Sequence, residues 1–213
     1  MAIKYNLEKF GIKQAVKWIS KNPDKNLIKL MDWGDKFAHG EFVGQRQAVR
    51  AAIEDENNAY HPLVNRIVCD MDNGVLTKFF TNFFLNANLI GWDRQEHYRD
   101  TYDCNVPWAI LLDPTSACNL HCTGCWAAEY GNRLNLTFDD IDDIIKQGKE
   151  MGVFMYIYTG GEPLVRKKDI IKLCEKHDDC IFLCFTNGTL IDEEFANDML
   201  RVQNFIPAIS LEG

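Results

Sequence analysis

The chain has 213 residues, of which 46% are hydrophobic and 25% charged, a balance typical of a soluble globular protein with a core. Its formal net charge of −8 argues against a general nucleic-acid binder, because such proteins normally carry a basic face. The N-terminus lacks the apolar segment of a signal peptide, and the most apolar helical stretch, 75–90, is too short and too polar for a membrane span. We therefore expect a cytoplasmic protein whose eight cysteines are thiols or metal ligands rather than disulfides.

Helical patterns dominate residues 1 to 100, which we interpret as a mostly α-helical N-terminal region. Apolar residues at helical spacing follow Pro23, and Pro62 stands where a helix favours its first residue. The Phe-rich helix over 75–90 has an apolar side that either packs in a core or contacts a lipid, a peptide or a partner protein. Residues 91–107 are polar and irregular in pattern, which predicts a linker.

Residues 101–213 change to short apolar runs that alternate with amphipathic helices. The predicted helices are 137–152, 167–178 and one around 192–200, and Thr137 and Asp140 are placed as a capping box. The predicted strands are 108–113, 153–159, 181–186 and 207–213. Strands of nearly continuous apolar residues alternating with helices predict an α/β fold with a parallel sheet.

Four strands do not close a barrel, and a last strand at the chain end leaves an open edge. The pattern fits either a small open sheet or the front part of a longer protein. We expect the second, with an α/β core at 101–213 that stops after the fourth strand of an incomplete parallel (β/α) barrel.

Three of the cysteines lie close together, at Cys118-x3-Cys122-x2-Cys125, directly after the first predicted strand. Structural zinc sites usually take four ligands, commonly as two separated CxxC pairs, and no second pair is present. His121 is the nearest fourth ligand, but its place between two of the cysteines makes a shared ion awkward. An iron–sulfur cluster that leaves one iron open needs only three thiolates.

Three further motifs follow the later predicted strands, each at the carboxyl end where α/β folds place their sites. They are TGGEP at 159–163, TNG at 186–188 and SLEG at 210–213. With the cysteine motif, this order of motifs resembles the radical S-adenosylmethionine (radical SAM) enzymes over about residues 107–213.

The resemblance implies a [4Fe–4S] cluster on Cys118, Cys122 and Cys125, with the open iron chelating S-adenosylmethionine. It implies reductive cleavage of that cofactor, with an electron from a flavodoxin- or ferredoxin-type donor, to a 5′-deoxyadenosyl radical that takes hydrogen from an unidentified substrate. The chain would then be an oxidoreductase- or transferase-type enzyme. A metal-binding scaffold without catalysis and a thiol redox protein are the alternatives.

The resemblance also implies which residues meet the cofactor. Gly160 and Gly161 allow close backbone approach, and Glu162 would accept hydrogen bonds from the methionine ammonium. Contacts to the ribose, to the carboxylate or to substrate would come from the later rim residues Thr186, Asn187 and Ser210.

Two positions leave the expectation open. Where the family pattern has an aromatic residue before the third cysteine, this chain has Gly124, so the adenine contact is expected from Trp126 or from the Gly124 backbone. Arg166 either meets an anionic substrate group or starts a solvated basic run with Lys167 and Lys168.

Overall fold

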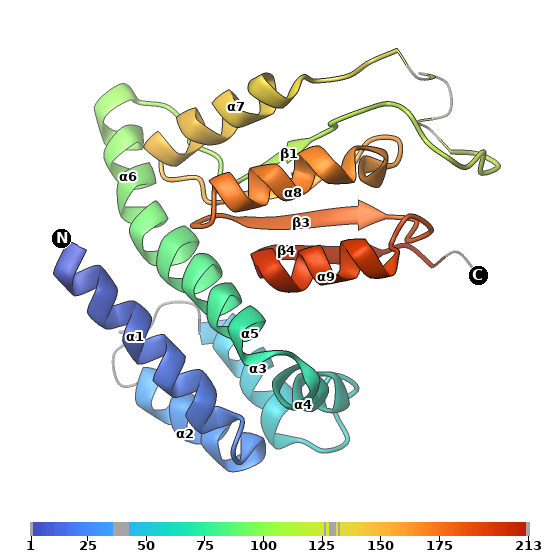
Figure 1. Ribbon diagram of the computed structural model, residues 1–213. Coiled ribbons are helices and arrows are strands. Elements are labelled where there is room, and N and C mark those ends of the chain that lie inside the picture. The colour runs from blue at the N-terminus through green and yellow to red at the C-terminus, as the bar shows by residue number, and fades with distance from the viewer. Residues whose placement is uncertain (1, 36–42, 126, 128–130, 132, 212–213) are drawn as a thin grey trace. The chain divides into compact units, whose positions relative to one another are not determined.

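The computed structural model describes the chain except residues 1, 36–42, 126, 128–130, 132 and 212–213 (Figure 1). By their internal contacts the residues form two compact units, Met1–Thr77 and Lys78–Gly213. The first unit is helical over its described residues, and the small apolar cluster in it contains Ile19, Leu27, Ile53 and Val68. Its helices are α1 (Ala2–Ile19), α2 (Pro23–Asp35), α3 (Val43–Glu54), α4 (His61–Asp70) and most of α5 (Asn73–Phe79).

The helix starts predicted at two prolines are confirmed. Helix α2 begins at Pro23, and Pro62 lies in the first turn of α4. Proline fits there because its fixed φ suits the helix and its missing N–H would have no partner in the first turn. None of the helices among the described residues combines the length and the hydropathy that a membrane crossing requires.

The second unit begins with one long helical segment that the sequence divided differently. A π-helix, η1 (Phe80–Ile90), follows α5, and α6 (Gly91–Tyr102) continues it directly. The prediction of a linker over 91–107 is therefore wrong for most of its length. The polar side chains of this segment suggested a solvated linker, but two of them bind backbone carbonyls near the turn between α7 and β2. Gln95 Nε2 donates to the Gly152 carbonyl at 2.9 Å, and Arg94 Nη1 donates to the Lys149 carbonyl at 3.0 Å.

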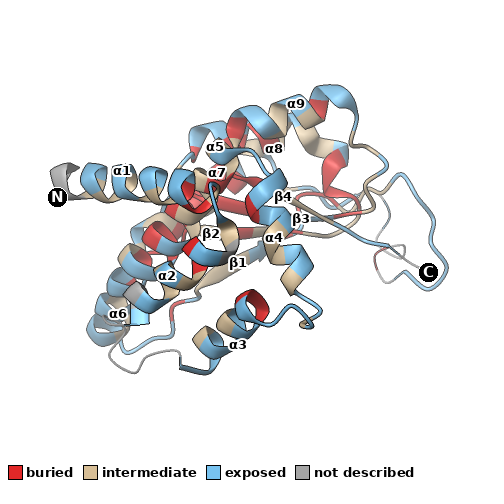
Figure 2. Cartoon of the chain, turned by 90° about the horizontal axis from the view of Figure 1, so that it is seen from below, coloured by how far each residue is buried: buried red, intermediate tan, exposed pale blue. Residues whose placement is uncertain are grey.

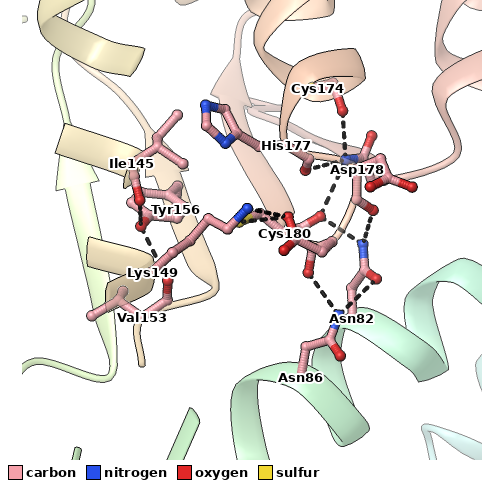
Figure 3. Close-up of polar contacts among 12 residues, drawn as sticks. Asn82, Asn86, Ile145, Lys149, Val153, Tyr156, Cys174, His177, Asp178 and Cys180 are labelled. Atoms are coloured by element: carbon pink, nitrogen blue, oxygen red, sulfur yellow. Dashed lines mark hydrogen bonds and ion pairs between the residues drawn. The ribbon is translucent and has the colours of Figure 1, made fainter. Parts of the chain in front are cut away.

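Two buried amides hold η1 against the turn before the third strand (Figure 3). Asn82 Nδ2 donates to the carbonyls of Asp178, at 2.9 Å, and Cys180, at 2.7 Å. Asn86 Nδ2 donates to the Asp179 carbonyl at 2.8 Å. These bonds give hydrogen-bond donors to three carbonyls at the amino end of β3, and so attach η1 to that end of the sheet.

The sheet has four parallel strands in the order β1-β2-β3-β4. They are β1 (Ala109–Leu112), β2 (Met155–Tyr158), β3 (Ile181–Thr186) and β4 (Phe205–Ile209). This confirms the predicted α/β class and parallel sheet, and the fourth strand begins two residues earlier than expected. Four neighbouring parallel strands joined in chain order through helices are the arrangement found in (β/α) barrels.

The connecting helices are α7 (Phe138–Glu150), α8 (Lys167–Lys176) and α9 (Glu193–Val202), and a 3₁₀ turn, η3 (Pro163–Arg166), precedes α8. They lie along one face of the sheet (Figure 1), as right-handed crossovers between adjacent strands require. The predicted capping box of α7 is present, with Thr137 Oγ1 accepting from the Asp140 N–H at 3.1 Å.

The core lies between these helices and the sheet, and Figure 2 colours its buried residues red. Tyr156, Tyr158 and Phe182 are completely buried, and the two tyrosine rings each stack on the Phe182 ring. The other face of the sheet carries Leu111 and Phe185, which are 59% and 47% exposed. Exposure on that face thus increases toward the carboxyl end of β3, since Ile181 at its start is 1% exposed.

A buried ionic contact joins α7 to the end of α8. His177 Nε2 lies 2.8 Å from Asp142 Oδ1, and both side chains are almost fully buried. Burial raises the pKa of the Asp142 carboxyl, but hydrogen bonds from Lys146, Lys176 and His177 outweigh it and leave this pKa below its usual value. Burial lowers the pKa of His177, and the bond to Asp142 offsets only part of that change.

Candidate functional site

The carboxyl ends of the four strands bring the predicted motifs to one edge of the sheet. Parallel strands end at the same edge, so the loops after them are neighbours. Figure 1 shows the loop after β1 on the side to which the arrowhead of β3 points. Backbone bonds confirm the contact between motifs: Gly161 N–H donates to the Thr115 carbonyl at 3.0 Å, and Ser210 N–H to the Thr186 carbonyl at 2.9 Å.

The three clustered cysteines lie on the loop between β1 and α7, which we call the cysteine loop (113–136). Cys122 and Cys125 are exposed, Cys118 is half-buried, and all three are free thiols. A turn bond from Cys125 N–H to the Cys122 carbonyl, at 3.3 Å, links the last two. Among the described residues no three His, Cys, Asp or Glu side chains are close enough to hold a single metal ion. A zinc site completed by His121 is therefore not formed in this structure.

Three other thiols are buried and protonated, unlike those of the cysteine loop. Cys174, Cys180 and Cys184 are fully buried in the main core. Burial, and to a smaller extent the Glu162 carboxylate, raises the pKa of Cys184 to about 12, and burial also raises the pKa of Cys174 and of Cys180. A metal binds the thiolate, so these three protonated thiols are core residues rather than ligands.

The two glycines of GGEP lie directly beneath the cysteine loop. A Cβ on Gly161 would be 2.3 Å from the Ala117 carbonyl oxygen and 2.5 Å from that of Ser116. Gly160 has φ +109°, a conformation that side-chain-bearing residues rarely adopt. Glu162 N–H completes the contact by donating to the Ala117 carbonyl at 2.8 Å. The glycines are needed because the end of β2 touches the backbone that leads into Cys118.

Glu162 is 1% exposed, and its carboxylate joins the ends of two strands. Oε1 accepts from the Leu164 N–H at 2.9 Å and from Thr186 Oγ1 at 2.7 Å. Oε2 accepts from the Asn187 N–H at 2.8 Å. The carboxylate is therefore not solvated, because it is buried and accepts hydrogen bonds from three neutral donors.

A ring of exposed or half-buried polar side chains connects the cysteine loop to the end of β3. Asn187 Nδ2 donates to Asn119 Oδ1 at 3.0 Å, and Asn119 Nδ2 donates to Thr189 Oγ1 at 2.8 Å. Thr189 Oγ1 closes the ring by donating to Asn187 Oδ1 at 2.7 Å. Asn119 follows Cys118 directly, so this ring ties the first cysteine of the motif to the TNG turn.

The predicted residues of the last two motifs lie at the same rim. Thr186 is buried, while the Ser210 residue is exposed. Thr186 Oγ1 donates to Glu162 and accepts from the Gly188 N–H at 3.0 Å. Trp126, the residue expected at the adenine, lies outside the described residues.

The departure at Gly124 has a backbone explanation. Its φ is +75°, and no heavy atom lies within 4 Å of where a Cβ would be. A Cβ would have room there, but any side chain would strain the backbone. The turn between Cys122 and Cys125 therefore favours glycine in this chain.

Arg166 is engaged in contacts within the protein, which contradicts the solvated basic run and leaves the contact with an anionic substrate group untested. Its guanidinium pairs with Asp169 at 2.7 Å and donates to two backbone carbonyls, those of Pro114, at 3.1 Å, and Leu136. Its side chain is 17% exposed, so it does not start a solvated basic run.

Sequence reasoning did not single out Arg166, Thr115 or Asn119 for these contacts. The Arg166–Asp169 pair has a local signal, since residues three apart on a helix are neighbours. The contacts from Arg166 and Asn119 to distant loops have none, because they depend on which loops the sheet brings together.

Comparison with known proteins agrees with the motifs. The family model described as the radical SAM superfamily matches residues 112–213. A GTP 3′,8-cyclase from Alkaliphilus oremlandii is 43% identical over 100 residues, covering 44% of this chain and 31% of the relative. A PqqA peptide cyclase from Streptomyces rochei is 32% identical over 100 residues, covering 45% of this chain and 27% of the relative.

A similar solved structure is that of Streptococcus suis SuiB bound to S-adenosylmethionine. Its TM-score is 0.47 at 21% sequence identity, covering 70% of this chain and 39% of that chain. The chain therefore spans less than half of the solved relative and less than a third of the two curated relatives.

Proposed function

We propose that the chain is a radical SAM enzyme or carries the cofactor-binding part of one, because the radical SAM superfamily model matches residues 112–213. Members of that superfamily bind a [4Fe–4S] cluster and S-adenosylmethionine. When bound, these groups would supply a reductive cleavage of the sulfonium to methionine and a 5′-deoxyadenosyl radical, which takes hydrogen from a substrate. The relatives are named for a nucleotide and for a peptide, so the proposal stops at hydrogen abstraction.

The observation that carries the proposal is the difference between the two groups of thiols. Cys118, Cys122 and Cys125 are free and accessible at the carboxyl edge of the sheet, whereas the core thiols are buried and protonated. Soft thiolate donors suit iron–sulfur clusters, and a cluster attaches each thiolate to a different iron, so the absence of a single-ion site is no obstacle. The donor set therefore fits the cluster.

The other rim residues would bind and orient the cofactor. This is supported by the strand order, since Gly160, Gly161, Thr186, Asn187 and Ser210 stand at or just after the carboxyl ends of β2, β3 and β4, and the cysteine loop begins at the carboxyl end of β1. We assign Glu162 to this group through the positions it fixes, since its carboxylate holds the Thr186 hydroxyl and the Asn187 amide in place. The Trp126 ring or the Gly124 backbone is assigned to the adenine on the sequence alone.

The proposal is tested by reconstituting the cluster without oxygen and measuring iron, sulfide and the cleavage of S-adenosylmethionine. We expect about four irons per chain and formation of 5′-deoxyadenosine after reduction. Replacing Cys122 with Ala should remove both. The matched control is Cys104→Ala, because Cys104 is an exposed free thiol outside the cysteine loop and its loss should change neither.

Three outcomes would contradict the proposal or limit it. A colourless protein with one zinc would exclude an iron–sulfur enzyme. Equal iron loss in the Cys104 and Cys122 variants would show adventitious binding. Full iron without 5′-deoxyadenosine would favour the alternative function, a metal-binding scaffold without catalysis.

The partners follow from the same proposal. Reduction needs an external one-electron donor, and a flavodoxin or ferredoxin supplies electrons of that kind. All eight cysteines are free thiols, which supports the proposal that the protein works in a reducing compartment such as the cytoplasm. Phe84 and Leu89 of η1 are 47% and 62% exposed, which supports an apolar contact through this helix.

A further inference from the structure

The two ends of the cysteine loop are held together in a short neck. Leu136 N–H donates to the Pro114 carbonyl at 3.2 Å, and Ser116 N–H donates to the Leu134 carbonyl at 2.8 Å. Between them Thr115 and Asn135 form an antiparallel bridge, with Thr115 Oγ1 donating to Asn135 Oδ1 at 2.5 Å. All three cysteines lie on the loop beyond this neck.

Arg166 binds both sides of the neck from the turn after GGEP. One guanidinium nitrogen, Nη1, donates to the Pro114 carbonyl on the incoming side and to the Leu136 carbonyl on the outgoing side. Nε and Nη2 donate to Asp169 Oδ2 at 3.2 and 2.7 Å, which fixes the plane of the guanidinium. The side chain is largely buried, so these bonds are made away from bulk water.

These contacts leave little of the guanidinium for a ligand. Arginine has five N–H donors in a planar fork, and both donors of Nη1, the Nε donor and one of Nη2 have partners. A bidentate contact to a carboxylate or phosphate would require breaking one of these bonds. The geometry therefore favours a role toward the loop over a role toward an anionic substrate.

We propose that Arg166 is a positioning residue for the cysteine loop, closing its neck so that the segment with the three thiols stays at the carboxyl edge of the sheet before a cluster binds. This inference rests on the proposed function, because only that proposal assigns cluster binding to the cysteine loop. Its physical basis is that joining the ends of a flexible loop lowers the entropy that ligand assembly must otherwise overcome. Arginine suits the task because its fork reaches two carbonyls and one carboxylate together, whereas a lysine ammonium is a single point charge.

The first test uses hydrogen exchange in the cluster-free protein. In Arg166→Gln the amides of Ser116 and Leu136, which bond across the neck, should exchange at least about tenfold faster. The Phe182 amide, which bonds to the Asn204 carbonyl in the core, should keep its rate. Lys168→Gln is the matched control, because Lys168 is exposed two residues away and its loss removes the same charge.

The second test measures how long the reconstituted cluster survives a chelator. Arg166→Gln should lose iron several-fold faster than the wild type, and Lys168→Gln should not. Arg166→Lys, which keeps the charge, should behave like Arg166→Gln in both tests, because its single nitrogen cannot stand both at the two carbonyls and at the Asp169 carboxylate, as Nη1, Nε and Nη2 do together.

The outcomes separate the inference from the proposed function. Wild-type rates at the neck in Arg166→Gln, or faster exchange at Phe182 to the same degree, would overturn the positioning role. Unchanged iron retention with a faster-exchanging neck would overturn it as well. If the wild type binds no iron, the proposed function fails, while faster exchange confined to the neck would still support Arg166 as the residue that holds this loop.

Discussion

Replacing Glu162 with Gln removes a buried charge and turns one of its two acceptor oxygens into a donor. The remaining oxygen can keep the bonds from Leu164 N–H and Thr186 Oγ1, which lie at 2.9 and 2.7 Å. The new amide group would instead face the Asn187 N–H, whose bond at 2.8 Å is lost. A hydrogen bond to a charged group contributes about 1.5–3 kcal/mol, and relief of the buried charge offsets part of its loss. We expect Glu162→Gln to lower the free energy of unfolding by about 2 kcal/mol.

The assay is urea denaturation of the cluster-free protein, followed by far-ultraviolet circular dichroism. Glu162→Ala removes all three bonds and leaves a cavity, so its loss should be about twice as large. Glu150→Gln is the control, since Glu150 is exposed at the end of α7 and its change should stay within about 0.5 kcal/mol. A Glu162→Gln protein as stable as this control would refute the view that the carboxylate holds the rim together.

Three other perturbations test the fold around the site. Gly161→Ala places a Cβ 2.3 Å from a carbonyl oxygen of the cysteine loop, so we expect the free energy of unfolding to fall by about 1–3 kcal/mol and iron retention to fall with it. The control is Gly44→Ala, which has open space at its Cβ and should be neutral or slightly stabilising. His177 and Asp142 have folded-state pKa values below their unfolded values of 6.5 and 3.8, so stability is complete above about pH 6.5 and falls as the pH drops. His177→Gln should flatten the dependence of the urea midpoint on pH between about 6.5 and 5, and an unchanged slope would contradict this assignment. Asn82→Ala removes the donor to the Asp178 and Cys180 carbonyls, of which Cys180 keeps the bond from Asn204 Nδ2 at 3.2 Å, and should cost about 1–2 kcal/mol in the same urea assay, whereas a loss below about 0.5 kcal/mol would show that water replaces the amide.

The elements with strong local signals were predictable. Strand β3 has the predicted bounds, because a run of apolar residues with β-branched and aromatic members leaves few alternatives. Helix α7 was marked by its capping box. The helix over 91–102 was not predictable, because its polar residues look like those of a linker in the sequence. Only the fold shows that Gln95 binds the Gly152 carbonyl.

The candidate site shows the same division between local and distant information. The sequence by itself determined which ligand chemistry we propose, because three cysteines within one loop after a strand are a local feature. The tertiary structure decided that Glu162 is a buried connector rather than a solvated side chain, and that Arg166 clasps a loop that begins more than fifty residues earlier in the chain. The physical reason is that such hydrogen bonds depend on the distance between strand ends, which is set by the parallel sheet and not by the spacing of residues along the chain.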